Sequence, residues 1–361
     1  MTESSRESIR LAMERMARMP HREAISGLPE FYEAQVVNSF SETGKHPFKA
    51  LVFNMECGTR LDKILPFLQY HRDLAGADII LANELDWGMA RSGNLNTSEE
   101  IARHLEMNYA FATEFITVSA WENGNREGRH GNAIFSRFPL KNVSILRLPI
   151  LYDWFYRKND SRLGTRVALL AEIEISGSRV GLMCLHLENR ATPEARKTQL
   201  CYALKGAEKA FDGIPVLIGG DMNTNTVDGD APDGMDIFYG DIPEQARRMA
   251  DIPAYEPLMP CAQKWGYSYE DCNIMDKPTR RKHAPGYPDI LLNLDWFFQR
   301  GLACWEPKRV ETVFSMSALT RKEEQFASFE GQELSDHDAV AVTCALKPDE
   351  VISLNRKDGK T

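Results

Sequence analysis

VLIGGDMN, residues 216–223, joins an apolar run directly to an acid and an amide. A short apolar run bounded by glycine is typical of a buried strand, so we expect Asp221 and Asn223 where that strand ends. Strand ends hold side chains rigidly at the rim of a sheet, where binding and catalytic residues are commonly found. A single acid in this position is more often a turn former, so the interpretation depends on how often the pattern recurs.

The pattern recurs in five further stretches, where polar residues directly follow or precede short apolar runs. These stretches are LVFNME (51–56), IILANELD (79–86), GLMCLHLEN (181–189), LNLDW (292–296) and LSDHDAV (334–340). The polar residues collected in this way are Asn54, Glu56, Glu84, His186, Asp221, Asn223, Asp295, Asp336 and His337. Nearly all offer oxygen or imidazole ligands, and hard oxygen ligands without thiolates favour Mg²⁺ or Mn²⁺ over zinc.

The rest of the sequence predicts many strands and few helices. This pattern predicts an α/β fold of two packed sheets flanked by helices. Strand-like runs are expected at 50–53, 79–82, 109–118, 132–136, 167–175, 180–187, 215–219, 291–298 and 339–346. A helical pattern begins at Leu61, and a second begins where Thr192 precedes Pro193 as N-cap. The segment 224–290 is rich in Asp, Pro and Gly, so we expect irregular loops there that shape the substrate site.

A single catalytic domain is predicted over residues 48–347, because no convincing linker interrupts it. Residues 1–47 are predicted to be an N-terminal helical extension and residues 348–361 a C-terminal tail. The extension carries apolar residues at helical spacing until Pro20 stops the pattern, namely Ile9, Met13, Met16 and Met19. We expect this helix to pack on the body of the protein, and residues 28–47 to be connecting chain.

Composition excludes several classes of protein. Hydrophobic residues make up 43% and charged residues 26%, which are ordinary globular values and not those of collagen-like or disordered chains. Acidic residues outnumber basic ones by 52 to 43, so a broad basic surface that coats nucleic acid is not expected. No apolar stretch is long enough to span a membrane, and the N-terminus is charged where a signal peptide would be apolar. These features predict a cytoplasmic protein with no transmembrane segment and no evident protein partner.

The seven cysteines are scattered singly along the chain, and none belongs to a C-x-x-C pair. They are Cys57, Cys184, Cys201, Cys261, Cys272, Cys304 and Cys344. We therefore expect reduced, mostly buried thiols, and neither a zinc ribbon nor a disulfide framework.

Taken in order, the strand-end stretches resemble the endonuclease/exonuclease/phosphatase superfamily, which includes deoxyribonucleases, apurinic endonucleases, neutral sphingomyelinases and inositol-polyphosphate phosphatases. GDMN (220–223) and SDH (335–337) carry the resemblance, together with the upstream N-x-E and N-E motifs and the intervening LDWFFQRG. It covers about residues 48–347. The resemblance implies a four-layer α/β sandwich of two central, mainly antiparallel sheets with helices outside.

The resemblance also implies roles for single residues. It places Asn54, Glu56, Glu84 and Asp336 around a Mg²⁺ or Mn²⁺ ion. It assigns His186 to a phosphate contact, Asn223 to holding phosphate or water, Asp221 to the activation of water, and Asp295 to the orientation of His337. Arg129, His130 and Arg166 match positions near the substrate. Arg196 and Gln199 share a helix face and are expected to support the HLEN loop rather than to take part in catalysis.

The function that follows is a divalent-metal-dependent phosphoesterase, which hydrolyses a phosphodiester bond by in-line attack of an activated water. The substrate stays open between nucleic acid, a nucleotide and a lipid headgroup, because the same centre serves all three in the superfamily. A DNA or RNA nuclease is one alternative; its candidate cations are Lys277, Arg280, Arg281 and Lys282, then Arg157, Lys158 and Arg162. A monophosphatase and a catalytically silent scaffold are the others.

Overall fold

The computed structural model describes residues 2–44, 47–117, 124–158, 161–232, 234, 236–238, 241–283 and 285–347. Within them the strands form a sheet of eight strands, a sheet of five and a two-stranded sheet. The larger sheet has the order β1 (Gln35–Val37), β4 (Asn108–Thr117), β5 (Arg129–Ser136), β3 (Ile79–Trp87), β2 (Phe48–Cys57), β15 (Ala339–Leu346) and β14 (Leu302–Val310), with β7 (Arg162–Gly164) paired to β4. The smaller has the order β13 (Asp295–Arg300), β10 (Val216–Asp221), β9 (Ser178–His186), β8 (Val167–Ile175) and β6 (Lys141–Arg147); β11 (Arg280–Lys282) pairs with β12 (Ile290–Leu292).

Pairing in both large sheets is mainly antiparallel, as predicted. Among the described strands of these sheets, β2 and β3 form one parallel pair and β9 and β10 form the other. Carboxyl ends of parallel neighbours lie at the same edge of a sheet. The regular pairing of β2 with β3 ends at Asn54 and Asn83, and that of β9 with β10 ends at His186 and Asp221. Asn54, Glu84, His186 and Asp221 therefore lie towards the carboxyl ends of the paired strands.

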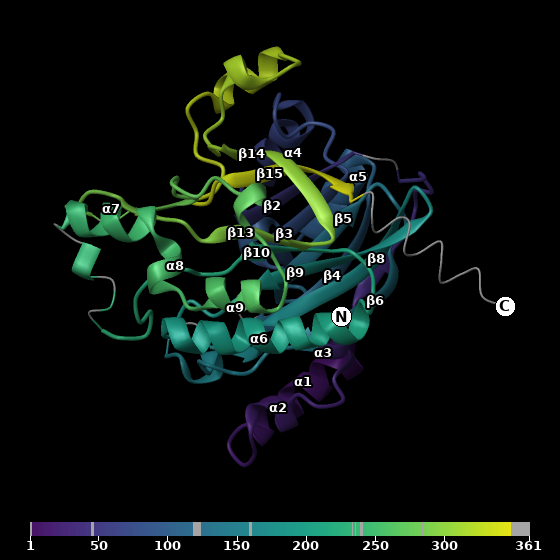
Figure 1. Ribbon diagram of the computed structural model, residues 1–361. Coiled ribbons are helices and arrows are strands. Elements are labelled where there is room, and N and C mark those ends of the chain that lie inside the picture. The colour runs from purple at the N-terminus through teal and green to yellow at the C-terminus, as the bar shows by residue number, and fades with distance from the viewer. Residues whose placement is uncertain are drawn as a thin grey trace.

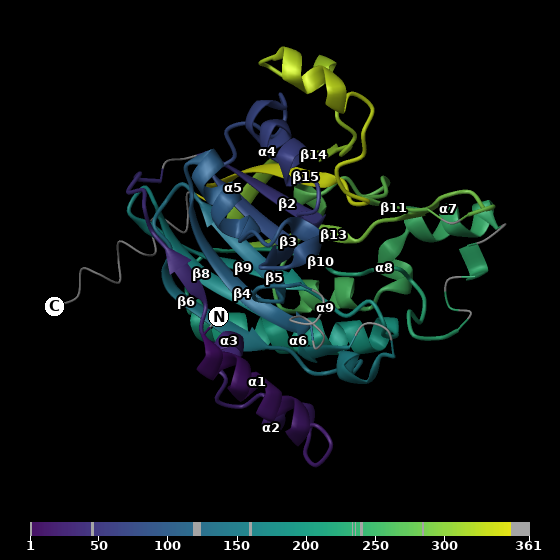
Figure 2. The same cartoon turned by 180° about the vertical axis from the view of Figure 1, so that it is seen from behind.

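Alternating side chains build the layers. In β2, Ala50 and Val52 join the core between the two sheets, whereas Leu51 and Phe53 face the helices outside. The helices α4 (Leu61–Tyr70) and α5 (Thr97–Leu105) cover the larger sheet, and α6 (Pro193–Ala210), α8 (Ile252–Tyr255) and α9 (Leu258–Lys264) cover the smaller. In Figure 1 the first pair lies above the sheets and α6 lies below them, and Figure 2 shows the same layers from behind. The four-layer α/β sandwich is confirmed.

The strand predictions agree with most of the sheet elements, and β8 and β15 have the predicted bounds. Thr192 caps α6, because its hydroxyl accepts a hydrogen bond from the N–H of Ala195. The prediction of irregular loops was wrong in part for the segment 224–290, because it also holds α7 (Ile242–Ala250), α8 and α9. Helix α7 buries Gln245 and Met249, so it has no continuous apolar stripe for the sequence to reveal. The described residues also form the short 3₁₀ helices η1 (Ala90–Ser92), η2 (Trp154–Tyr156), η3 (Asp236–Phe238), η4 (Glu270–Cys272), η5 (Met316–Ala318) and η6 (Glu324–Phe329).

The N-terminal segment packs on the body of the protein, as predicted for its first helix. It forms α1 (Glu3–Arg15), α2 (His21–Ala24) and α3 (Pro29–Tyr32), drawn in purple at the bottom of Figure 1. Ile9 and Phe31 are buried against Ile116 and Leu163 of the larger sheet. The interpretation of residues 28–47 as connecting chain was wrong in part, since α3 and β1 lie there. The division at residues 47 and 48 stays a prediction, and the tail 348–361 lies outside the described residues.

The expectation that every cysteine is reduced was wrong. Cys201 and Cys261 form a disulfide across a sequence separation of 60 residues. The two residues lie on α6 and α9, which pack against each other on the smaller sheet. That proximity depends on the tertiary fold, so cysteine spacing could not show it. Among the described helices, none combines the length and the hydropathy that crossing a bilayer requires.

Candidate active site

The strand-end residues converge on one buried cluster, with Asp221 at its centre. Asp221 Oδ2 accepts a hydrogen bond from Asn54 Nδ2 at 3.1 Å. The same oxygen lies 3.5 Å from His186 Nε2 and 3.8 Å from His337 Nε2. Asn54 Nδ2 also donates to Glu84 Oε1 at 3.2 Å. The structure thus brings together residues from both large sheets that lie up to about 280 positions apart.

The backbone is strained where it presents this cluster. Glu84 and Asn223 have φ values of +55° and +50°, a region that costs a residue other than glycine about 1–3 kcal/mol. Irregular pairing between β2, β3 and β5 accompanies the change at Glu84. Gly220 has a φ of +142°, and a Cβ there would lie 1.9 Å from the carbonyl oxygen of Leu185. Only glycine lets β10 pass β9 this closely just before Asp221.

Asn83, which the sequence did not single out, fixes the backbone beneath Asp221. Its Oδ1 accepts the Asp221 N–H at 2.8 Å, while its Nδ2 donates to the carbonyl of Leu185 at 2.9 Å. The Asn223 N–H donates to Asp221 Oδ1 at 2.9 Å. Asn223 Nδ2 donates to the carbonyl of Leu187 at 2.9 Å. One carboxylate oxygen of Asp221 is therefore held by the chain, and the other faces the cluster.

His337 is held by Asp295, the pairing that the resemblance implied. Asp295 Oδ2 lies 2.8 Å from His337 Nδ1 and also accepts a hydrogen bond from the Thr279 hydroxyl at 2.7 Å. Burial would lower the pKa of His337, but the neighbouring carboxylates, Asp295 foremost, outweigh burial and raise the pKa to about 10. His337 is therefore an imidazolium at neutral pH, with Nε2 directed at Asp221. Thr279 was missed because a threonine in a loop carries no signal of this role.

His186 is held from behind by Arg166, so Arg166 is not a free substrate contact. The Arg166 guanidinium donates to His186 Nδ1 at 2.8 Å and to Glu114 Oε2 at 3.1 Å. Arginine has donors and no acceptor, so Nδ1 of His186 must accept and the proton lies on Nε2, which faces Asp221. Arg166 also lies 3.5 Å from Glu188, and Glu114 is fully buried. No sequence pattern pointed to Glu114 as part of this support.

The cluster has the chemistry of a site for a hard divalent cation. It holds the carboxylates of Glu84, Asp221 and Asp295 beside the imidazolium of His337. Burial would raise the pKa of Glu84, but the neighbouring imidazoles, His186 foremost, outweigh it and hold the pKa well below its usual range. Among the described residues, Asp295 Oδ1 is buried without a hydrogen-bond partner. The surplus of negative charge and the oxygen donors fit Mg²⁺ or Mn²⁺.

Glu56 and Asp336, two of the predicted metal ligands, lie together, but each is paired with an arginine. The Asp336 N–H donates to Glu56 Oε2 at 3.2 Å. Arg280 binds Asp336 Oδ2 through Nε at 3.0 Å and Nη2 at 2.8 Å, and Arg60 pairs with Glu56. Among the predicted acidic ligands, Glu84 is therefore the one that forms no ion pair with an arginine in the described residues, and neutral Asn54 lies beside it.

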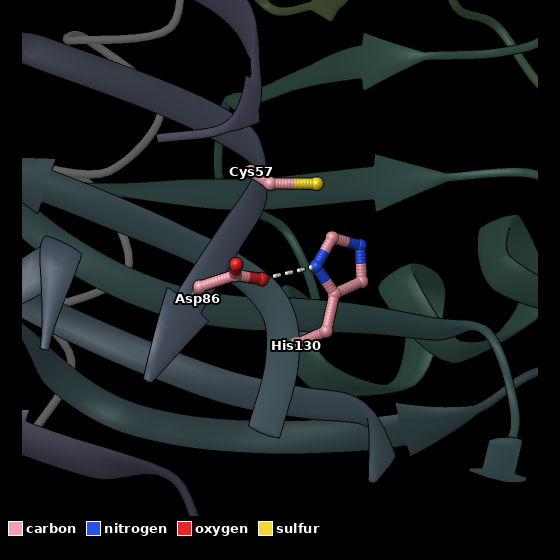
Figure 3. A group of neighbouring side chains, drawn as sticks. All are labelled: Cys57, Asp86 and His130. Atoms are coloured by element: carbon pink, nitrogen blue, oxygen red, sulfur yellow. Dashed lines mark hydrogen bonds and ion pairs between the residues drawn. The ribbon is translucent and has the colours of Figure 1, made fainter. Parts of the chain in front are cut away.

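His130 lies in a second group, with Asp86 and Cys57, whose ligand atoms lie within 4.8 Å of one another. Figure 3 shows Asp86 bonded to the imidazole of His130 and the Cys57 sulfur above them. Arg91 also binds both Asp86 oxygens, at 2.7 and 2.8 Å. The Arg91 guanidinium already neutralises Asp86. We therefore interpret this group as a support for the end of β3 next to Glu84 and not as a metal site.

The structure does not bring Arg129 to the cluster. Its guanidinium stacks 4.5 Å from the ring of Trp87 and lies 3.5 Å from Glu127, and no contact described for it reaches a cluster residue. Arg196 and Gln199 do support the HLEN loop, as predicted. Gln199 Oε1 accepts the Glu188 N–H at 2.9 Å, and Arg196 donates to the carbonyl of Ala191 at 2.6 Å.

The chain is similar to several known proteins. The model of the Endonuclease/Exonuclease/phosphatase family matches residues 51–299. The uncharacterized protein YbhP of Escherichia coli K12 is 27% identical over 199 residues, which cover 50% of this chain and 69% of YbhP. The solved endonuclease/exonuclease/phosphatase of Beutenbergia cavernae has a TM-score of 0.52 at 15% identity, covering 83% of this chain and 72% of that one.

The human Nocturnin catalytic domain, solved with a bound sulfate anion, has a TM-score of 0.50 at 15% identity and covers 87% of this chain and 97% of its own. At such low identity the two solved structures show a shared fold. The family match is independent of them and covers more than half of the chain. The protein belongs to the Endonuclease/Exonuclease/phosphatase family, whose members generally hydrolyse phosphoester bonds with the help of a divalent metal.

Proposed function

We propose that this protein is a divalent-metal-dependent phosphodiesterase. The observation that supports it best is the setting of Asp221, whose outer oxygen lies between 3.1 and 3.8 Å from an amide and two imidazoles. A carboxylate, an imidazolium and a buried acidic ligand side by side are the groups that hydrolysis of a phosphate ester needs.

Glu84 and Asn54 would hold the metal, with Asp336 available if Arg280 releases it. When bound, Mg²⁺ or Mn²⁺ supplies positive charge that offsets the charge of the phosphate oxygens. Glu84 suits this role because it stays ionised despite its burial. Asn54 suits it because its amide lies next to Glu84 and Asp221; the ligand atom would be Oδ1, which accepts the Glu56 N–H at 3.2 Å.

The protein's own side chains divide the remaining work. Asp221 takes the proton of the attacking water, since its oxygen faces the cluster and the Asn223 N–H fixes its other oxygen. His337, kept protonated by Asp295, donates from Nε2 to a phosphate oxygen as negative charge builds up there. His186 donates from Nε2 to a second oxygen, because Arg166 fixes its tautomer.

The test is hydrolysis of bis-p-nitrophenyl phosphate with Mg²⁺ or Mn²⁺ and again with EDTA. We expect metal-dependent turnover that Asp221→Asn reduces by about 10²–10⁴-fold, the usual contribution of a general base. Asp276→Asn, at an exposed position outside the cluster, is the matched control and keeps wild-type turnover. Unchanged turnover by Asp221→Asn would contradict the scheme.

Substrate class is decided by a panel of plasmid DNA, single-stranded RNA, nucleotides and sphingomyelin, each with metal and with chelator. Preference for a monoester over a diester would replace the proposal with a monophosphatase. No turnover of any substrate would favour a non-catalytic member of the family.

A further inference from the structure

A cationic pocket opens next to the catalytic cluster. It is lined by Asn223, which fixes Asp221, by Arg280, which binds Asp336, and by Asn189, Arg190, Asn225, Gly229, Lys282, Leu292 and Leu294. Its volume is about 130 Å³, well below the roughly 300–1,000 Å³ of a typical small-molecule site. One water occupies roughly 30 Å³ of liquid, so the pocket suits one polar group of a ligand rather than a whole ligand.

Strand β11 determines which cations face the pocket. Arg280 and Lys282 are two positions apart and therefore lie on the same side of the strand, together with Leu292, the partner of Arg280 in β12. Arg281 points the other way and pairs with Glu333 and Asp338. Successive side chains of β11 point to opposite faces, so Arg280 and Lys282 face the pocket and Arg281 does not.

Lys282 is the cation in the pocket that lacks a partner. Arg280 binds Asp336, and Arg190 pairs with Asp230 at 3.4 Å. Within the described residues, the half-buried ammonium of Lys282 has neither a hydrogen bond nor an ion pair. Burial and the neighbouring Arg280 and Arg190 lower its pKa and outweigh the opposing charge of Asp236, which forms no ion pair with it among the described residues.

Neutral amides complete the lining. Asn189 Oδ1 is buried without a hydrogen-bond partner in the described structure. Asn225 Nδ2 lies 3.4 Å from the carbonyl oxygen of Asn189. Side-chain amides rotate to present either a donor or an acceptor, so Asn189 can donate to an anion once one is present. The pocket therefore combines an unpaired cation with an unsatisfied amide.

We propose that the cationic pocket binds a second phosphate group of the substrate, next to the phosphodiester that is cleaved. This inference rests on the proposed phosphodiesterase function, because Asn223 and Arg280 place the pocket directly beside that site. The substrate class it defines is a phosphodiester that carries a further phosphate group. That group comes either from a phosphorylated nucleotide chain or from a phosphorylated sugar headgroup.

The test compares two pairs of diesters in the presence of Mg²⁺ or Mn²⁺. One pair is a thymidine dinucleotide with and without a 5′-phosphate; the other is glycerophosphoinositol with and without a ring phosphate. We expect kcat/KM to favour the phosphorylated member of one pair by about tenfold, the lower end of what a charge-assisted hydrogen bond contributes. The pair that shows the preference identifies the source of the phosphate.

Lys282→Met should abolish this preference, because it removes the ammonium and keeps a side chain of similar length. Lys277→Met, which changes an exposed lysine on the preceding segment, should keep it. Melting temperatures of both variants confirm that they fold. No preference in either pair, or a preference that survives in Lys282→Met, would overturn the proposal.

A binding measurement separates this inference from the proposed function. Inorganic phosphate is titrated into metal-free protein, and stabilisation against heat is recorded for the wild type and both variants. We expect stabilisation of the wild type and of Lys277→Met that is lost in Lys282→Met; equal stabilisation of all three refutes the pocket. If no diester is hydrolysed, the proposed function fails, and this titration still decides whether the pocket binds phosphate.

Discussion

Replacing Asp295 with asparagine should lower the pKa of His337 by about three units. Asp295 Oδ2 and His337 Nδ1 are 2.8 Å apart, and both side chains are buried. Two unit charges about 4 Å apart interact by about 4 kcal/mol at an effective dielectric constant of about 20. At about 1.4 kcal/mol per pKa unit, this gives about three units, which accounts for most of the rise from 6.5 to about 10.

The variant keeps an oxygen that accepts the Nδ1 proton, so the imidazole should stay in place and lose its charge at a lower pH. In the wild type, kcat for bis-p-nitrophenyl phosphate should hold up to alkaline pH, because His337 stays protonated until about pH 10. In Asp295→Asn the decrease of kcat at high pH should begin about three pH units lower. The imidazole signal of metal-free protein, followed by NMR against pH, measures the same shift without turnover.

A second histidine–aspartate pair offers the matched control. His283 Nδ1 and Asp289 Oδ1 are also 2.8 Å apart, but their side chains are 56% and 46% exposed. Solvent screens that pair, so Asp289→Asn should change the pKa of His283 far less and leave the pH profile of kcat unaltered. If Asp295→Asn shifts neither the NMR titration nor the decrease of kcat at high pH, the assignment of His337 as a protonated donor is refuted.

Three further predictions follow from buried charges. Arg196→Met should destabilise the protein by roughly 3–5 kcal/mol in urea unfolding, because both side chains of the Arg196–Glu256 pair are fully buried; a loss below about 1 kcal/mol would contradict this. Glu84→Gln should weaken Mn²⁺ binding at least tenfold by calorimetry, and wild-type affinity would exclude Glu84 as a ligand. In chelator, the raised pKa of His337 stabilises the fold fully below pH 6.5, and this contribution should be lost as the pH rises to about 10; a flat stability profile that His337→Gln does not alter would argue against the buried charge.

The sequence predicted the cluster well because its residues follow short apolar runs. A strand that ends in a polar residue places that residue at the rim whatever the rest of the fold does. Asn54, Glu84, His186 and Asp221 all followed this rule. Asn83 was not predicted, although it is next to Glu84. Its role depends on hydrogen bonds to β9 and to Asp221, which only the tertiary fold brings close.

The pairing of charges could not be predicted. Asp336 looked like a metal ligand because it adjoins His337, yet Arg280 binds it from 56 positions away. Arg166 looked like a substrate contact, yet Glu114, 52 positions earlier, helps to hold it behind His186. Local sequence shows that a charge is present, whereas burial and the long-range partner decide whether that charge is free to act.

The acidic composition is compatible with a phosphate substrate because acidic and basic side chains lie at different places within the site. The net charge of -9 is spread over a large surface, where salt screens interactions beyond about 8 Å. Within the proposed site, Glu84 and Asp221 belong to the cluster suited to a divalent cation, and Lys282 lines the neighbouring pocket together with Asn223. In the proposed mechanism, a phosphate bound at this site meets positive charge from the metal and from Lys282. Arg280 lies between the two regions: while it binds Asp336, it keeps that carboxylate from repelling the substrate, and its own charge adds to that of Lys282.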